Sequence, residues 1–301
     1  MLLSELLKKY DIVENYVIKN EKEIESLALS GSNIDLKFCT FVESKKYLNQ
    51  LSLNATMVFT TDELSEEILE CGKGVCIVEN PRLSFFLLHN AMQDYDSYRR
   101  MDRPVVIGEN CRISDKACIA TQNVKIGDNV IIEEFVSIKE NTEIGDNCII
   151  RAGSIIGGEG FEHKRNGEEI ISVKHLGGVI IENNVELQQG NFVDKAIYPW
   201  DNTIIGEGTK TDNNVHIAHA DKIGKRVFIA ACTCIAGRVE TGDDVWIGPG
   251  VTIINGIFIG NKAKISIGSV VTKPVMENER VTGNFAIEHS KFLENIKKSL
   301  Q

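Results

Sequence analysis

The feature that most constrains the fold is an aliphatic residue followed by glycine that recurs at a fixed distance. From Ile126 to Ile144 the distance is 18 residues, and the same spacing runs from Ile205 through positions 223, 241 and 259. Eighteen residues are three groups of six, so one coil of the chain has three flat faces. This hexapeptide periodicity predicts a parallel β-helix over residues 105–275, with coils stacked about 4.8 Å apart.

The alternative to this fold is a sheet of ordinary hairpins. Such a sheet would carry Asn-Gly or Asp-Gly turns between alternating strands. Here the turn residues instead keep one phase with the aliphatic positions over most of residues 105–275, which favours the β-helix. Two interruptions of the period, residues 158–178 and the 24-residue step from Ile181 to Ile205, are expected to project as loops of the kind that often bind ligands.

The first 100 residues lack the six-residue period and are expected to fold separately. Apolar runs at 55–60 and 74–78 predict buried strands, and the spacing of apolar residues at 81–92 predicts a helix. Residues 1–100 are therefore interpreted as a small α/β domain, with a charged linker at 95–104.

The tail at residues 284–301 is expected to form a short helix. Phe292, Ile296 and Leu300 recur at helical spacing with lysines between them. Two interpretations stay open: a helix that caps the end of the repeat, or a contact for an acidic partner.

Composition and charge exclude several classes of function. A formal charge of −10 and a pI near 5.2 argue against nucleic acid as the main partner, because phosphate contacts need a basic face. The N-terminus lacks the apolar core of a signal peptide and no segment is long enough to span a membrane, so a cytoplasmic protein is expected. Its eight cysteines are then expected to be reduced. Because neither Cys71 and Cys76 nor Cys232 and Cys234 has a matching second pair, no metal site is predicted.

Two histidines lie inside the repeat. The phase of the inward aliphatic residues makes His216 point outward and puts His219 at a corner of the prism. Adding 18 to each number places Gly237 above His219, Asn255 above Gly237, and Cys234 above His216. A corner histidine thus has a backbone glycine about 5 Å above it.

This arrangement suits acyl transfer. A neutral imidazole can take a proton from an attacking amine or hydroxyl, and the N–H of Gly237 could donate to the oxyanion of an attacked carbonyl. A thioester needs no covalent enzyme intermediate, so Cys234 is interpreted as a packing residue. Two alternatives for His219 are a solvated corner residue and a zinc ligand, and the latter would need a third ligand in register.

The run Asn-Val-His-Ile-Ala-His-Ala at 214–220 resembles the bacterial UDP-3-O-acylglucosamine N-acyltransferases of lipid A synthesis. Val-Glu-Asn-Pro-Arg-Leu at 78–83, Ile-Gly-Gly-Glu-Gly-Phe at 156–161 and Asp-Asn-Thr-Ile-Ile-Gly at 201–206 extend the resemblance over nearly the whole chain. It implies a mostly β fold: a left-handed parallel β-helix of hexapeptide repeats, with a small N-terminal α/β domain and a short C-terminal helix.

The resemblance also implies roles for particular residues. His219 matches the family's catalytic base and Gly237 its oxyanion glycine. Phe41 and Tyr47 match aromatic residues that stack on the nucleotide base. Other positions depart from the family: Ser44 replaces its asparagine, and Asn255-Gly256 is followed by isoleucine in place of a further histidine. The substrate-binding residues implied in this way are Phe41, Ser44, Tyr47, Phe161, His216 and Asn255.

These observations predict an acyltransferase that acts as a homotrimer without a tightly bound cofactor. Its donor would be an acyl thioester of acyl carrier protein or coenzyme A, and its acceptor the amine of a nucleotide-linked amino sugar. The short tail and the absent second histidine favour one alternative, an acetyl-CoA-dependent N- or O-acetyltransferase for a surface-polysaccharide sugar. A second alternative is a non-catalytic scaffold that binds nucleotide sugars.

Overall fold

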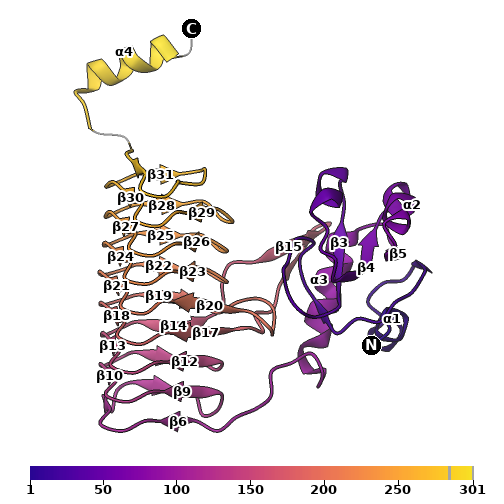
Figure 1. Cartoon of the computed structure of the whole chain (residues 1–301), viewed down its shortest axis with the longest axis horizontal. Helices are drawn as coiled ribbons and strands as arrows, with labels where there is room; N and C mark the ends of the chain where they lie inside the picture. Colours follow the sequence, from indigo (N-terminus) through magenta and orange to yellow (C-terminus); the bar gives the residue numbers. More distant parts are fainter. Residues whose placement is uncertain (284–285, 300–301) are drawn as a thin grey trace. The chain divides into compact units, whose positions relative to one another are not determined.

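The structure, a computed structural model, describes residues 1–283 and 286–299. It divides the chain into two compact units (Figure 1). The N-terminal unit consists of Met1–Pro104, Glu159–Gly178 and Lys195–Asn202. The second unit, called the prism here, consists of Val105–Gly158, Val179–Asp194 and the chain from Thr203 onward. Two segments inside the range predicted for the β-helix, 159–178 and 195–202, therefore pack in the N-terminal unit.

The N-terminal unit contains a five-stranded sheet in the order β1-β5-β4-β3-β2. Only β1 runs antiparallel to its neighbour β5. The central strands are apolar and buried on both faces, as expected for parallel strands covered by helices. The strands are β1 (Val17–Lys19), β2 (Ser26–Leu27), β3 (Phe38–Val42), β4 (Ala55–Thr60) and β5 (Gly74–Ile77).

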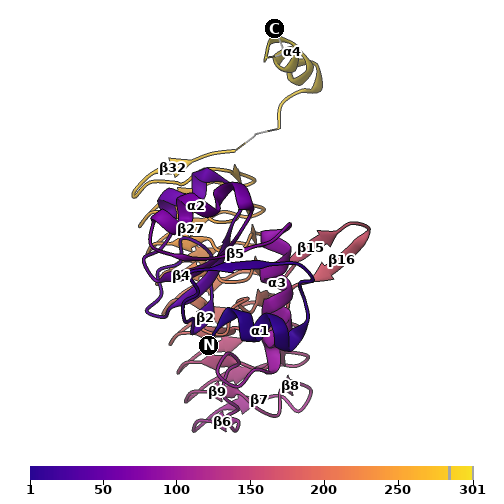
Figure 2. The same cartoon turned by 90° about the vertical axis from the view of Figure 1, so that its right-hand side faces the viewer.

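The strands predicted at 55–60 and 74–78 correspond to β4 and β5, and the predicted helix corresponds to α3. Asn80 caps α3 by accepting a hydrogen bond from the Leu83 N–H at 3.0 Å. Figure 2 shows the β15–β16 hairpin of this unit beside α3. Its other elements are α1 (Leu3–Tyr10), η1 (Lys45–Gln50), α2 (Asp62–Glu70), α3 (Pro81–Ala91), η2 (Met92–Asp94), β15 (His163–Asn166) and β16 (Glu169–Ser172).

Among the described residues, the strands of the prism form three parallel sheets, one on each face. The first face comprises β6 (Val106–Ile107), β9 (Val124–Ile126), β12 (Thr142–Ile144), β17 (Gly178–Ile181), β20 (Asn202–Ile205), β23 (Lys222–Ile223), β26 (Glu240–Thr241) and β29 (Phe258–Ile259). The second comprises β7 (Arg112–Ile113), β10 (Ile131–Ile132), β13 (Ile149–Ile150), β18 (Glu186–Leu187), β21 (Lys210–Thr211), β24 (Phe228–Ile229), β27 (Trp246–Ile247), β30 (Lys264–Ile265) and β32 (Arg280–Val281). The third comprises β8 (Cys118–Ile119), β11 (Ser137–Ile138), β14 (Ile155–Gly158), β19 (Phe192–Asp194), β22 (His216–Ile217), β25 (Cys234–Ile235), β28 (Thr252–Ile253) and β31 (Val270–Val271).

The coils stack in the 18-residue register predicted from the sequence. Ile217 lies opposite Ile235, which lies opposite Ile253. These inward aliphatic side chains have no exposed surface, and together with their equivalents on the other faces they form one continuous core. Since each strand is only a few residues long, the stability of the prism comes from stacking between coils.

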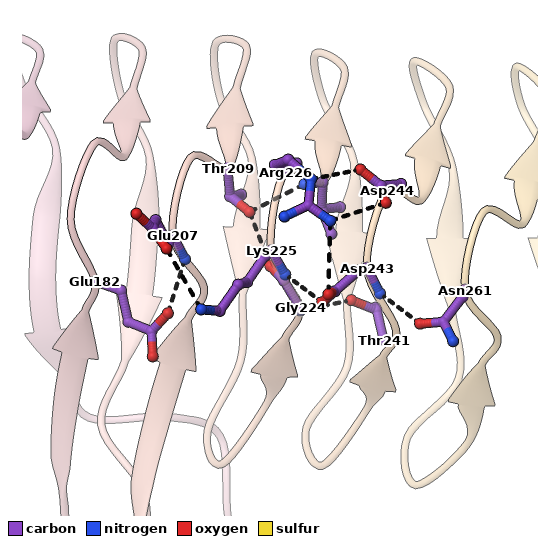
Figure 3. Close-up of polar contacts among 11 residues, drawn as sticks. Glu182, Glu207, Thr209, Gly224, Lys225, Arg226, Thr241, Asp243, Asp244 and Asn261 are labelled. Atoms are coloured by element: carbon purple, nitrogen blue, oxygen red, sulfur yellow. Dashed lines mark hydrogen bonds and ion pairs between the residues drawn. The ribbon is translucent and has the colours of Figure 1, made fainter.

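Polar contacts follow the corner between the first and second faces (Figure 3). The Lys225 N–H donates to the Asp243 carboxylate at 2.8 Å, and the Asp243 N–H donates to the side-chain oxygen of Asn261 at 2.8 Å. Glycine precedes these residues because the coils approach closely there. A Cβ on Gly224 would lie 2.2 Å from the carbonyl oxygen of Gly242 in the next coil, which explains the recurrent Ile-Gly pair.

Two coils are longer than 18 residues. The chain leaves the prism after β14 and returns at β17, and it leaves again after β19 and returns at β20. Both departures lie at the edge between the third and first faces, the edge that β22 and β23 continue one coil later. The interruptions predicted from the period are therefore excursions from a single edge of the prism.

The helix α4 (His289–Ser299) lies within the predicted range 284–301. Positions 284–285 and 300–301, including the predicted apolar Leu300, lie outside the described residues. Phe292 and Ile296 are largely exposed on α4. Among residues 1–283 and 286–299, no helix combines the length and apolar character needed to cross a bilayer.

Close stacking at the corner predicts that Gly224→Ala destabilises the prism. The new methyl group would overlap backbone atoms that cannot rotate away, so we expect a loss of about 1–3 kcal/mol or more in the free energy of unfolding, measured by urea denaturation. Lys225→Ala is the matched control: its side chain is exposed and pairs with Glu207 at 3.4 Å, and its loss should cost less than about 1 kcal/mol. Equal effects of the two substitutions would contradict the packing argument.

Candidate active site

His219 lies in the turn between β22 and β23, at the corner where the sequence phase puts it. Its side chain is almost fully buried. Gly237 lies one coil above: a Cβ on Gly237 would be 2.6 Å from Cε1, 2.7 Å from Nε2 and 3.0 Å from Nδ1 of His219. Because three ring atoms are nearly equidistant from this point, the face of the imidazole packs against the glycine. Any side chain at position 237 would displace the ring.

The backbone of this corner is strained. Ala220, directly after His219, has a φ of 62°, and Arg238, directly after Gly237, has a φ of 63°. A left-handed conformation costs roughly 1–2 kcal/mol for a residue with a Cβ. Hydrogen bonds hold both residues: the Ala220 N–H donates to Thr203 Oγ1 at 2.8 Å, and the Arg238 N–H donates to the His219 carbonyl at 3.0 Å. The two turns are therefore fixed one above the other.

The backbone amide of Gly237 is available as a donor. Among the described residues, none accepts a hydrogen bond from its N–H, whereas its carbonyl accepts one from the Gly256 N–H at 3.1 Å. Asn255, predicted to lie above Gly237, is exposed at the next turn of the same edge. A basic ring and a free amide donor thus face the same corner, which is the pairing that carbonyl chemistry requires.

His216 points outward from the third face and pairs with a carboxylate. Its Nε2 donates to Asp194 Oδ2 at 2.9 Å. This hydrogen bond raises the pKa of His216 above its ordinary value of 6.5, although partial burial opposes the shift. Cys234 lies above it, with Sγ 3.8 Å from Nδ1. Burial raises the pKa of the Cys234 thiol, which disfavours the nucleophilic thiolate and agrees with the packing role expected from the sequence.

Three polar residues near His219 escaped the sequence analysis: Asp194, Thr203 and Asp221. Asp194 belongs to the coil below, and the 24-residue length of that coil displaces it from any count by 18. Thr203 and Asp221 occupy inward positions two residues before Ile205 and Ile223, where the repeat calls for aliphatic side chains. A polar residue at an inward position was the signal that could have identified both.

The other predicted site residues lie in the N-terminal unit. Phe41 packs against Phe85 and Phe86, with ring centroids 5.1 and 5.9 Å away. Tyr47 is exposed on η1, which Ser44 precedes as the N-cap residue. Phe161 is 88% exposed. The structure thus separates the eight predicted residues into two sets, with His216, His219, Gly237 and Asn255 in the prism.

The N-terminal unit also contains a polar pocket that the sequence analysis missed. Its volume is about 340 Å³. It lies between the N-terminus of α3 and the β15–β16 hairpin, two segments far apart in the sequence, so no local pattern could have revealed it. Its lining residues are Glu43, Asn80, Arg82, Leu83, His163, Lys164 and Arg165.

No metal site accompanies these groups in the part of the chain that the structure describes. Within residues 1–283 and 286–299, His, Cys, Asp and Glu side chains form no group of three or more that could hold a metal ion.

Sequence comparisons match the repeat to known transferase repeats. The model of the bacterial transferase hexapeptide (six repeats) matches residues 123–158. The model of the hexapeptide repeat of succinyl-transferase matches residues 104–134 and 238–273. The prism and these matches place the chain among the hexapeptide-repeat transferases.

Longer matches narrow this class. The UDP-3-O-acylglucosamine N-acyltransferase of Helicobacter pylori is 30% identical over 269 residues, which cover 82% of this chain and 78% of that protein. The enzyme of the same name from Helicobacter hepaticus is 28% identical over 318 residues, covering 95% and 91%. The chain belongs to the UDP-3-O-acylglucosamine N-acyltransferase family and is an acyltransferase.

Solved structures agree on the fold. The UDP-N-acetylglucosamine acyltransferase of Arabidopsis superposes with a TM-score of 0.51 at 23% identity, covering 64% of this chain and 73% of that one. The enzyme of the same name from Francisella novicida gives 0.50 at 23% identity, covering 64% and 71%. The predicted fold class, a left-handed parallel β-helix with a small N-terminal α/β domain and a short C-terminal helix, is confirmed.

The His216–Asp194 pair predicts a pH-dependent contribution to stability. Because the pKa of His216 is raised on folding, this contribution is fully present below pH 6.5, the ordinary pKa, and is lost as the pH rises through the raised pKa. Asp194→Asn should therefore lower the free energy of unfolding more at about pH 6 than at about pH 9. Urea denaturation at the two pH values measures this, with His216→Gln as the background in which the difference should vanish. An equal effect at both pH values would contradict the pairing.

Proposed function

We propose that this chain transfers an acyl group from a thioester to the amine of a nucleotide-linked amino sugar, as the name of its relatives describes. The observation that carries the proposal is the stacking of His219 beneath Gly237. The imidazole lies against the glycine, and the glycine N–H has no acceptor among the described residues. A proton acceptor and an oxyanion donor are thus held together on adjacent coils.

His219 acts in this mechanism as the general base. Its neutral imidazole removes a proton from the acceptor amine as the nitrogen attacks the thioester carbonyl carbon. The carbonyl oxygen becomes an oxyanion, and the Gly237 N–H donates to it. When the intermediate collapses, the C–S bond breaks and the sulfur leaves as a thiol that takes the proton from the imidazolium. The new C–N bond is the amide, so neither a covalent enzyme intermediate nor a tightly bound cofactor is needed.

His216 has a different role in this proposal. Its outward position and the carboxylate of Asp194 favour the protonated ring, which suits contact with an anionic part of the substrate or of the donor. Asn255 lies exposed on the edge that carries His219 and is proposed as a further substrate contact. Phe41, Ser44, Tyr47 and Phe161 remain proposed contacts of the nucleotide, and of these Tyr47 and Phe161 offer exposed rings for stacking.

We also propose that the chain works as a homotrimer. Large apolar side chains stand exposed on the outer faces of the prism, and exposed apolar surface of this kind marks contact sites. They include Phe192, Phe228, Trp246, Phe258 and Val270. A cytoplasmic location fits the eight cysteines, all described as free thiols.

The base assignment predicts that His219→Ala lowers kcat by about 10²-fold or more, because a positioned general base contributes on that order. Steady-state kinetics with an acyl thioester and an amino-sugar nucleotide measure this. His289→Ala, at an exposed position of α4, is the control and should leave the rate unchanged. A His219→Ala enzyme as active as the wild type would refute the mechanism and favour a binding scaffold.

The donor and acceptor are tested by a panel. Acetyl-CoA and a long-chain acyl carrier protein are each combined with UDP- and dTDP-linked amino sugars, and product formation is followed by mass spectrometry. We expect turnover with the acyl carrier protein and the UDP sugar. Turnover with acetyl-CoA alone would instead assign the chain to acetylation of a surface-polysaccharide sugar, the alternative that the short tail favours.

A further inference from the structure

Two polar side chains interrupt the aliphatic core beneath the catalytic corner. Thr203 and Asp221 point inward one coil apart, and neither has exposed surface. Val179 and Val239 occupy the corresponding positions of the flanking coils and are fully buried as well. Burying a polar group without a hydrogen bond costs free energy, so the bonds that these two side chains make indicate what they do.

Thr203 joins the two histidine-bearing parts of the site. Its hydroxyl donates to the backbone carbonyl of Asp194 at 2.6 Å and accepts from the Ala220 N–H at 2.8 Å. Asp194 holds His216 through its carboxylate. Ala220 is the residue after His219 and has the strained left-handed backbone. One hydroxyl therefore fixes the turn that aims His219.

Asp221 joins that turn to the coil above. Its backbone N–H donates to the Ala218 carbonyl at 3.4 Å, which closes the turn around His219. Its Oδ1 accepts from the Val239 N–H at 2.8 Å. Asp221 is two residues after His219, and Val239 is two residues after Gly237. The carboxyl thus connects the chain that bears the imidazole to the chain that bears the oxyanion donor.

The Asp221 carboxyl acts here as a neutral acceptor. Burial raises its pKa well above the usual range, and the nearby Asp194 acts in the same direction. Within the described residues, its Oδ2 has no hydrogen-bond partner, so nothing on that side stabilises the ionised form. An asparagine, whose side-chain carbonyl has the same shape, could accept the same bond from Val239.

We propose that Thr203 and Asp221 are positioning residues that fix the distance and orientation between His219 and the Gly237 amide. This inference rests on the proposed function, since it concerns the same two groups. It goes further by naming residues outside the predicted site that determine the geometry. A misplacement of about 1 Å between reacting groups can cost up to about 10²-fold in rate, so small shifts of either turn are sufficient to affect turnover.

The test compares disruptive and conservative substitutions. Thr203→Val and Asp221→Leu remove the hydrogen bonds while keeping similar volumes, and each should lower kcat roughly tenfold or more. KM should stay within about twofold, because the bound groups are misaligned and not removed. Thr203→Ser and Asp221→Asn retain the bonds and should keep near-wild-type kcat.

Thr209→Val is the matched control. Thr209 is fully buried in the same prism, and its hydroxyl donates to the Gly224 carbonyl at 2.9 Å and accepts from the Val227 N–H at 3.1 Å. It lies at the corner drawn in Figure 3, away from the turn of His219. Its loss should lower the melting temperature about as much as Thr203→Val while leaving kcat unchanged. If Thr209→Val lowers kcat as much as Thr203→Val, or Asp221→Asn lowers it as much as Asp221→Leu, the proposal is overturned.

Amide hydrogen exchange at Ala220 and Val239 separates this inference from the proposed function. Faster exchange at Ala220 in Thr203→Val and at Val239 in Asp221→Leu supports the positioning role even if no acyl transfer is found. Unchanged exchange at both amides overturns it even if the wild type is an active acyltransferase. If Asp221→Leu does not fold, the comparison of Thr203→Val with Thr203→Ser decides the question.

Discussion

The hydrogen bonding of each coil to the next in an 18-residue register is the constraint on which the rest of the prism depends. A strand such as β22, with two residues, has no stability of its own, and its buried backbone groups are paired only because another coil lies above and below. The same register brings residues 18 apart into contact. His219 and Gly237 face each other for the same reason that Ile217 and Ile235 do.

Chemistry has been added to this scaffold at a cost in core packing. Aliphatic side chains fill the inward stack in the flanking coils, but a hydroxyl and an uncharged carboxyl replace them below the catalytic corner. Ala220 adopts a backbone conformation that asparagine adopts at other corners, such as Asn129 and Asn147. Such departures from the locally stable choice are expected where a site must hold a defined geometry.

Much of this was predictable because the period is constant from Ile205 onward. Counting by 18 put Gly237 over His219 and Cys234 over His216, as the structure has them. The count fails for Asp194, because the coil that carries it has 24 residues. It also cannot show that residues 159–178 and 195–202 pack in the N-terminal unit. That packing depends on contacts between distant segments, which leave no local periodicity.

A stack of coils also unfolds in a particular way. Each coil is stabilised only by its neighbours, so melting begins at the ends and moves inward, as in a one-dimensional chain of coupled units. The coil of β22 has three further strands on one side in its sheet and four on the other. Fraying at either end can therefore open several coils while the corner of His219 stays closed. The corner keeps its geometry at temperatures where the tips of the prism have already begun to melt.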